Sequence, residues 1–140
     1  MTRYIGLDLG SKTLGVSISD GLLMIASTYE TFRFEEDNYM LAANRVKEIV
    51  LKEKISKVIL GMPKHMNGDI GIRGKISEDF KKMIQELIDV EVILEDERLT
   101  TAFVNKIMIS GNTNRKKRKE KKDEMAAVVI LQNYLDRKVY

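Results

Sequence analysis

Cysteine is absent from this chain of 140 residues. Its absence excludes disulfides, thiolate catalysis and zinc or iron–sulfur sites built on cysteine. Long apolar runs are also absent, and because none reaches 18 residues the sequence predicts no transmembrane helix. The N-terminus leads directly into a strand pattern without a signal peptide, which predicts a cytoplasmic protein. Proline occurs only at Pro63 and histidine only at His65.

Net positive charge is confined to one segment. Residues 115–122, RKKRKEKK, carry seven positive charges and one negative charge, a net of +6 in a chain whose total is +3. The rest of the chain therefore carries −3. Such a run is typical of a phosphate-binding patch, and the alternative is a segment that is merely solvated. Because residues 110–122 hold few apolar groups and many like charges, we expect a flexible, poorly ordered loop there.

The hydrophobic pattern predicts one domain over residues 1–140. Runs rich in β-branched residues predict strands at 3–9, 13–19, 23–34, 57–62 and 90–94. Apolar residues at helical spacing predict helices at 37–54, 75–88, 102–108 and 123–136. The glycine-rich, polar segment 65–74 is expected to be a loop.

The order of these elements predicts an α/β fold. The first three strands have no helices between them and should form an antiparallel meander, whereas the later strands alternate with helices and should run parallel to the first. The result is a mixed five-stranded sheet with helices on both faces, in which the first strand is central.

Acidic residues interrupt or border three apolar elements. Asp8 lies inside the first strand, where a buried charge is costly unless it is paired or bound to a metal. The pair Asp96 and Glu97 follows the last strand, and Asp123 opens the last apolar helix. Ligands of open α/β sheets bind at the edge where parallel strands end, so we expect these carboxylates to converge there. Bound Mg²⁺ or Mn²⁺ would offset their repulsion and could promote phosphodiester cleavage.

Each acidic position also has a simpler interpretation. Asp8 could accept hydrogen bonds from the following turn, Asp123 could be a helix N-cap, and Asp96 and Glu97 could be a solvated strand end. The combination of all three with a basic run directly before Asp123 favours the metal-site hypothesis.

Four segments carry a resemblance to a known family: IGLDLGSKTLGVSISD at 5–20, ILGMPKHMNGDIGIRG at 59–74, DERLTT at 96–101 and KKDEMAAVVILQNYLD at 121–136. They resemble the YqgF (RuvX) family of Holliday-junction-resolvase-like proteins over essentially the whole chain. The resemblance implies a ribonuclease H-like fold. It also implies a hydrolase, a metal-dependent nuclease that processes pre-16S ribosomal RNA during ribosome biogenesis.

The resemblance also implies roles for individual residues. Asp8, Glu97 and Asp123 match the catalytic, metal-binding carboxylates, with Asp96 and Glu124 as alternatives to the last two. Nine basic residues are expected to contact phosphate: Arg73, Arg98, Arg115, Lys116, Lys117, Arg118, Lys119, Lys121 and Lys122. Thr100 and Thr101 either donate hydrogen bonds at the site or cap a helix, and His65 stays outside the catalytic set.

Other functions fit parts of the same pattern. DLGSKTLGVSISD also resembles the phosphate loop of actin-like ATPases and sugar kinases, but 140 residues leave no room for the two domains that those proteins need. A resolvase of four-way DNA and a non-catalytic RNA-binding module for ribosome assembly remain alternatives. The expected partners are a nucleic acid and a ribosomal particle. The protein is expected to be a monomer, or a homodimer if it makes paired cuts.

Overall fold

The computed structural model describes residues 2–62, 71–96 and 115–138, with side chains described except at 73, 96, 115–124 and 138. The described elements are β1 (Arg3–Leu9), β2 (Thr13–Ser19), β3 (Ala26–Arg33), α1 (Tyr39–Glu53), β4 (Ile55–Met62), α2 (Ile72–Leu87), β5 (Glu91–Asp96) and α4 (Arg115–Lys138). Within these ranges, no helix is long and apolar enough to cross a membrane. The helix expected at 102–108 lies outside the described residues.

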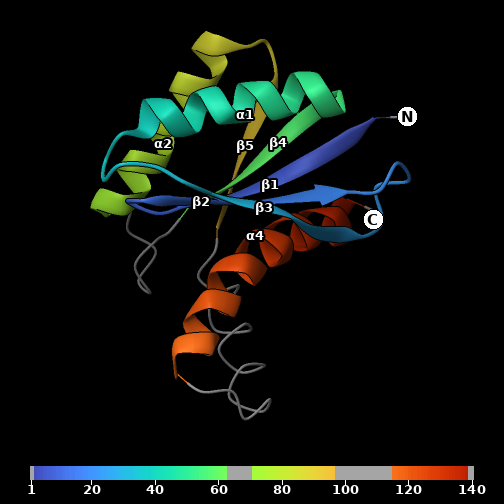
Figure 1. The fold of residues 1–140 in the computed structure, drawn as a ribbon. Helices are drawn as coiled ribbons and strands as arrows, with labels where there is room; N and C mark the ends of the chain where they lie inside the picture. The colour runs from blue at the N-terminus through green and yellow to red at the C-terminus, as the bar shows by residue number, and fades with distance from the viewer. Residues whose placement is uncertain (1, 63–70, 97–114, 139–140) are drawn as a thin grey trace.

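The five strands form one mixed sheet in the order β3-β2-β1-β4-β5. Strands β1, β2 and β3 are paired antiparallel, and β4 and β5 run parallel to β1. Helices α1 and α2 cover one face of the sheet and α4 covers the other (Figure 1). The predicted meander, the parallel half and the central position of the first strand are all confirmed.

Strand β1 is apolar on both faces because both faces are covered. Ile5 and Leu7 lie in the cluster beneath α1 and α2, whereas Tyr4 lies in a second cluster with residues of α4. Because side chains alternate along a strand, Gly6 and Asp8 share the α4 side with Tyr4. Asp8 is therefore a carboxylate on a face that otherwise packs against a helix.

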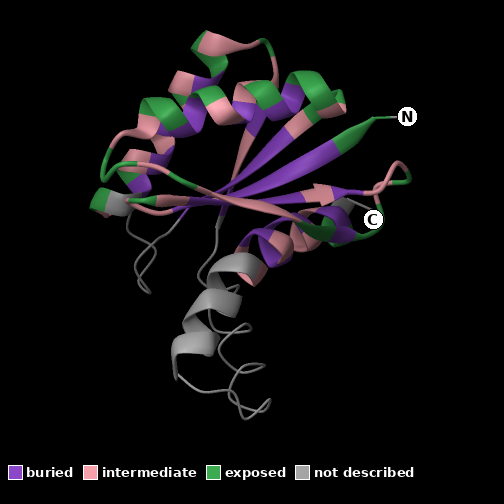
Figure 2. Cartoon of the chain, viewed as in Figure 1, coloured by how far each residue is buried: buried purple, intermediate pink, exposed green. Residues whose placement is uncertain are grey.

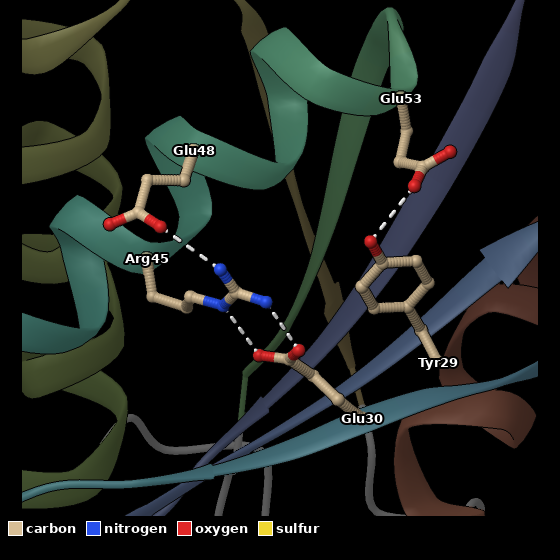
Figure 3. A network of polar contacts seen from close by, with 5 residues as sticks. All are labelled: Tyr29, Glu30, Arg45, Glu48 and Glu53. Atoms are coloured by element: carbon tan, nitrogen blue, oxygen red, sulfur yellow. Dashed lines mark hydrogen bonds and ion pairs between the residues drawn. The ribbon is translucent and has the colours of Figure 1, made fainter.

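The α1 and α2 face holds the main core, which Figure 2 shows as buried stretches along the sheet and the two helices. Val46 and Ile49 of α1 and Phe80 and Ile84 of α2 are almost completely buried there. Polar contacts at the edge of this layer tie α1 to β3 (Figure 3).

The α4 face holds a smaller cluster, in which Leu131 and Leu135 of α4 pack against β1 and β4. Near the last turns of α4, the Nζ of Lys57 donates to the hydroxyl of Tyr134 at 3.3 Å and lies 5.2 Å from the ring centre of Tyr4. Burial opposes the charge of Lys57, but the hydrogen bond to Tyr134 and the nearby tyrosines together raise its pKa. The C-terminal half of α4 is therefore fastened to the start of β1 and β4.

Three predicted boundaries are wrong by three residues or more. The third strand begins at Ala26 and not at residue 23, because residues 20–25 form a turn in which the carboxylate of Asp20 accepts hydrogen bonds from two backbone N–H groups. Helix α2 begins at Ile72, so the predicted loop at 65–74 extends three residues too far. In addition, α4 begins at Arg115, so residues 115–122 are helical and not a loop.

The error at α4 has a plain physical reason. Arginine, lysine and glutamate are good helix formers, and neither glycine nor proline occurs between residues 115 and 138. The apolar helix that follows continues N-terminally through the basic run without interruption. Charge composition alone was a poor guide to secondary structure at residues 115–122, and residues 110–114 of the predicted loop lie outside the described residues.

Candidate active site

Asp8 is the next-to-last residue of the central strand, at the edge where β1, β4 and β5 all end. It is half-buried. Because side chains alternate along β1, Asp8 lies on the α4 side of the sheet, two residues beyond Gly6. This is the edge at which open α/β sheets bind their ligands, as expected from the sequence.

Glycines flank Asp8 in the neighbouring strands. Gly15 is its partner in β2. In β4, Leu60 pairs with Leu7 of β1, and since these strands are parallel the next residue, Gly61, lies beside Asp8. Cross-strand neighbours stand on the same face of a sheet. The positions beside Asp8 in both adjacent strands therefore carry no side chains, which leaves its carboxylate approachable along the sheet.

Helix α4 lies very close to β1 at Gly6, two residues before Asp8. The hydroxyl of Ser17 donates to the carbonyl oxygen of Ala127 in α4 at 2.7 Å. Residue 6 has no side chain at this point, and Leu131 and Ala127 of α4 lie directly against it. The helix therefore contacts the strand almost backbone to backbone.

The contacts also fix the direction of α4. The rings of Tyr4 and Tyr134 are 6.1 Å apart, whereas Gly6 lies against Ala127 and Leu131. Residue numbers thus fall along α4 as they rise along β1, so the helix runs antiparallel to the strand.

This packing relates position 123 to Asp8. Position 123 lies one helical turn, about 6 Å, before Ala127. Asp8 lies two residues, about 6.6 Å, beyond Gly6. Starting from the contact between Gly6 and Ala127, both positions are displaced toward the same edge of the sheet by similar distances. Asp123 lies within α4 and not at its start, so the alternative that it is a helix N-cap is wrong.

Glu95 is a buried carboxylate that the sequence analysis missed. It pairs with Gly61 and so lies at the level of Asp8, about 10 Å away across two strands. Its side chain is 3% exposed and forms an ion pair with Arg137 in the last turn of α4. In the sequence, Glu95 directly precedes the acidic pair Asp96 and Glu97. Only the strand pairing shows that β5 extends through Glu95.

Alternation along β5 also separates the acidic positions. Position 95 faces α4, so position 96 lies on the opposite side of the sheet from Asp8. Five residues singled out from the sequence lie outside the described residues, namely His65, Glu97, Arg98, Thr100 and Thr101. For Arg73, Asp96, Asp123, Glu124 and residues 115–122, the backbone is described and the side chains are not.

The basic run forms the first turns of α4, which project beyond the sheet (Figure 1). Helical geometry puts positions 116, 119 and 123 on one side of the helix and positions 118 and 122 on a different side. Arg73 is the second residue of α2, which packs on the face of the sheet opposite α4. The basic first turns of α4 continue beyond position 123, on the side of the edge that carries Asp8.

The donor chemistry of the predicted carboxylates suits a divalent cation. Mg²⁺ and Mn²⁺ prefer hard oxygen ligands such as carboxylates. Among the side chains that the structure describes, no three acidic or histidine residues gather into a possible metal site. Of the predicted trio, only Asp8 belongs to that described set, so the candidate site rests on its position.

Comparison with known sequences shows close relatives along nearly the whole chain. The model of the RuvX family, described as Holliday junction resolvase, matches residues 2–137. A protein of Bacillus cytotoxicus is 46% identical over 136 residues, which cover 97% of this chain and 99% of the relative. A protein of Lactococcus lactis subsp. cremoris is 47% identical over 134 residues, covering 96% and 94%. Both relatives bear the name "Putative pre-16S rRNA nuclease".

Solved structures share the fold. RuvC of T. thermophilus in complex with a Holliday junction substrate aligns with a TM-score of 0.59 at 12% identity, covering 99% of this chain and 96% of that one. The fowlpox virus Holliday junction resolvase aligns with a TM-score of 0.57 at 17% identity, covering 99% and 100%. The ribonuclease H-like fold expected from the sequence is thus confirmed. The family match and the full-length relatives show that this chain belongs to the RuvX family of Holliday junction resolvase-like proteins.

Proposed function

We propose that this protein is a metal-dependent nuclease that hydrolyses phosphodiester bonds in structured nucleic acid, with the precursor end of 16S ribosomal RNA as its substrate. One observation carries the proposal. Asp8 stands half-buried at the end of the central strand, between two glycines and on the face covered by α4, in a chain whose close relatives carry that nuclease name.

In this proposal Asp8, Glu97 and Asp123 hold Mg²⁺ or Mn²⁺. A divalent cation bound there would activate water and neutralise the charge that develops on the phosphate during cleavage. The alternation of β5 argues against Asp96, since position 96 lies on the side of the sheet away from Asp8. Glu95 has an ion pair with Arg137 and therefore a structural use.

The protein's own contribution is to bind and orient the substrate. The chain outside residues 115–122 carries −3 and would repel a polyanion, so we propose that the basic first turns of α4 attract the phosphate backbone. Arg73 and Arg98 would then contact phosphates closer to the carboxylates. The glycines beside Asp8 would let the backbone of the nucleic acid approach. A nuclease that cuts precursor ribosomal RNA would act in the cytoplasm, and this is the location that we propose.

The test is cleavage by the purified protein with Mn²⁺ of three substrates: a structured RNA that contains the 16S precursor end, a single-stranded RNA and a four-way DNA junction. We expect the structured RNA to be cut fastest and Asp8→Asn to be inactive. Preference for the junction would instead identify a DNA resolvase. Tight RNA binding without metal-dependent cleavage would favour a non-catalytic assembly module.

A further inference from the structure

We propose that Gly6 is a positioning residue: by having no side chain, it sets the distance between α4 and β1 and so the spacing between positions 8 and 123 of the proposed metal site. This inference rests on the proposed function, because it concerns the same metal site. It adds a residue that would contact neither metal nor substrate.

The space at Gly6 is filled by α4 itself. A Cβ atom on residue 6 would lie 2.6 Å from Ser17 Oγ, 2.7 Å from Leu131 Cβ and 2.8 Å from the carbonyl oxygen of Ala127. Real Cβ atoms essentially never approach other heavy atoms within 3.0 Å. Leu131 Cβ and the Ala127 carbonyl oxygen are not side-chain ends that could swing away, and Ser17 Oγ is held by its hydrogen bond to Ala127, so a Cβ there has to displace the helix or the strand.

Gly10 is not crowded in this way. A Cβ at Gly10 would be nearest to Thr13 Oγ1, at 3.1 Å, and the three atoms closest to it all belong to Thr13 in the same turn. At Gly6, two of the three nearest atoms belong to a helix more than one hundred residues away in the chain. The helix is also held in place here, because Ser17 donates its hydrogen bond to Ala127 at 2.7 Å.

The consequence for the site follows from the spacing along the two elements. Asp8 is two residues from Gly6, and Asp123 is one turn from Ala127. The contact between Gly6 and Ala127 therefore sets the spacing of the two elements close to both positions. A displacement of about 1 Å at a reacting site can cost roughly 100-fold in rate. The geometry of the metal site therefore depends on Gly6, which lies on the same face of β1 as Asp8 but does not bind the metal.

The experiment measures Mn²⁺ binding to the purified protein by calorimetry without substrate, alongside cleavage and thermal stability. Gly6→Ala should weaken Mn²⁺ binding by about tenfold or more, the usual effect of disturbing groups that orient metal ligands. Leu131→Ile is a milder test, because it adds a branch at the Cβ atom that touches Gly6. It should weaken binding in the same direction.

Leu135→Ile is the matched control. It makes the same change on the same helix and in the same cluster, at a residue that is also almost fully buried, one turn farther from Asp123. It should lower the melting temperature about as much as Leu131→Ile and leave Mn²⁺ binding unchanged. If Gly6→Ala does not fold, the comparison of these two leucine variants decides.

The outcomes separate this inference from the proposed function. If Asp8→Asn loses Mn²⁺ binding while Gly6→Ala and Leu131→Ile bind as the wild type does, Gly6 has no positioning role and the metal site stands. Equal weakening by Leu131→Ile and Leu135→Ile would also overturn the inference, since it would show a general effect of stability. If Asp8→Asn binds Mn²⁺ as well as the wild type, the metal site and the inference both fail.

Discussion

The two faces of the sheet differ in what their residues do. Beneath α1 and α2 the sheet presents a continuous layer of buried aliphatic and aromatic side chains. Beneath α4 the apolar cluster is smaller, and the same face carries Gly6, Asp8 and three buried polar residues, Ser17, Ser19 and Glu95. One face therefore supplies most of the apolar burial, and the other carries the candidate chemistry.

This difference teaches how one small domain can combine stability with a polar site. Burial of apolar area is the main stabilising term, and the α1 and α2 face provides the larger share of it. Glycines and a half-buried carboxylate reduce stability. The α4 face can hold them because the α1 and α2 face supplies most of the apolar burial. Changes on the two faces should accordingly have different effects.

The largest expected effect is on activity and comes from Asp8→Asn. The substitution keeps the shape of the side chain and removes the charge that a metal requires, so cleavage should fall by about 100-fold or more. The melting temperature should change little, because asparagine has nearly the same shape and volume as aspartate. Asp79→Asn, at an exposed position of α2, is the control and should cleave as the wild type does. Normal activity in Asp8→Asn would contradict the mechanism.

Core substitutions test the two faces directly. Phe80→Ala, at a fully buried residue of α2, should cost about 3–5 kcal/mol of unfolding free energy, measured with urea. The protein that remains folded should keep its Mn²⁺ affinity. Leu131→Ala on the α4 face should cost about 2–5 kcal/mol and also weaken Mn²⁺ binding. Equal Mn²⁺ affinity in the two variants would remove the distinction between the faces.

The basic turns of α4 offer a comparison of the two sides of one helix. Lys116→Gln with Lys119→Gln changes the side that carries position 123, and Arg118→Gln with Lys122→Gln removes the same charge from another side. Glutamine keeps the helix propensity nearly constant. The first pair should weaken RNA binding more. It should also reduce the slope of log affinity against log salt by roughly 0.7–0.9 for each phosphate that the variant no longer binds. Equal slopes for the two double variants would indicate nonspecific attraction.

The smallest expected effect concerns the edge of the α1 and α2 face. Arg45 donates two hydrogen bonds to Glu30, at 2.7 and 2.6 Å, and another to Glu48 (Figure 3). The hydrogen bonds from Arg45 lower the pKa of Glu30, despite the opposing effect of burial. Glu30→Gln should therefore lower the unfolding free energy at pH 7 by about 1–2 kcal/mol.

The pH dependence of that effect has a definite sign. A carboxyl group with a lowered pKa in the folded state stabilises the protein above its unfolded pKa, and this contribution is lost as the pH falls. The difference between wild type and Glu30→Gln in urea unfolding should shrink as the pH drops below 4.5, the ordinary pKa of a glutamate side chain. Glu36→Gln, at an exposed position, serves as the control. A constant difference down to acidic pH would show that the ion pair contributes little.

The sequence by itself determined the class of fold and the place of Asp8. Short β-rich runs, helical spacing of apolar residues and the absence of helices among the first three strands were sufficient for the mixed sheet and its central strand. These features are local in the chain, so they can be recognised without knowing what packs against them. An aspartate inside an apolar strand is equally local, and the predicted strand order placed it at the edge where the parallel strands end.

Only the tertiary structure decided how α4 meets the sheet. It showed that residues 115–122 continue a helix, that Glu95 is buried at the level of Asp8, and that Gly6 lies against Ala127 and Leu131. The sequence is a poor guide to these facts because each depends on how segments far apart in the chain pack together. The spacing of a strand and a helix is set by the smallest side chains between them. Which residues those are becomes known only when the two elements are packed together.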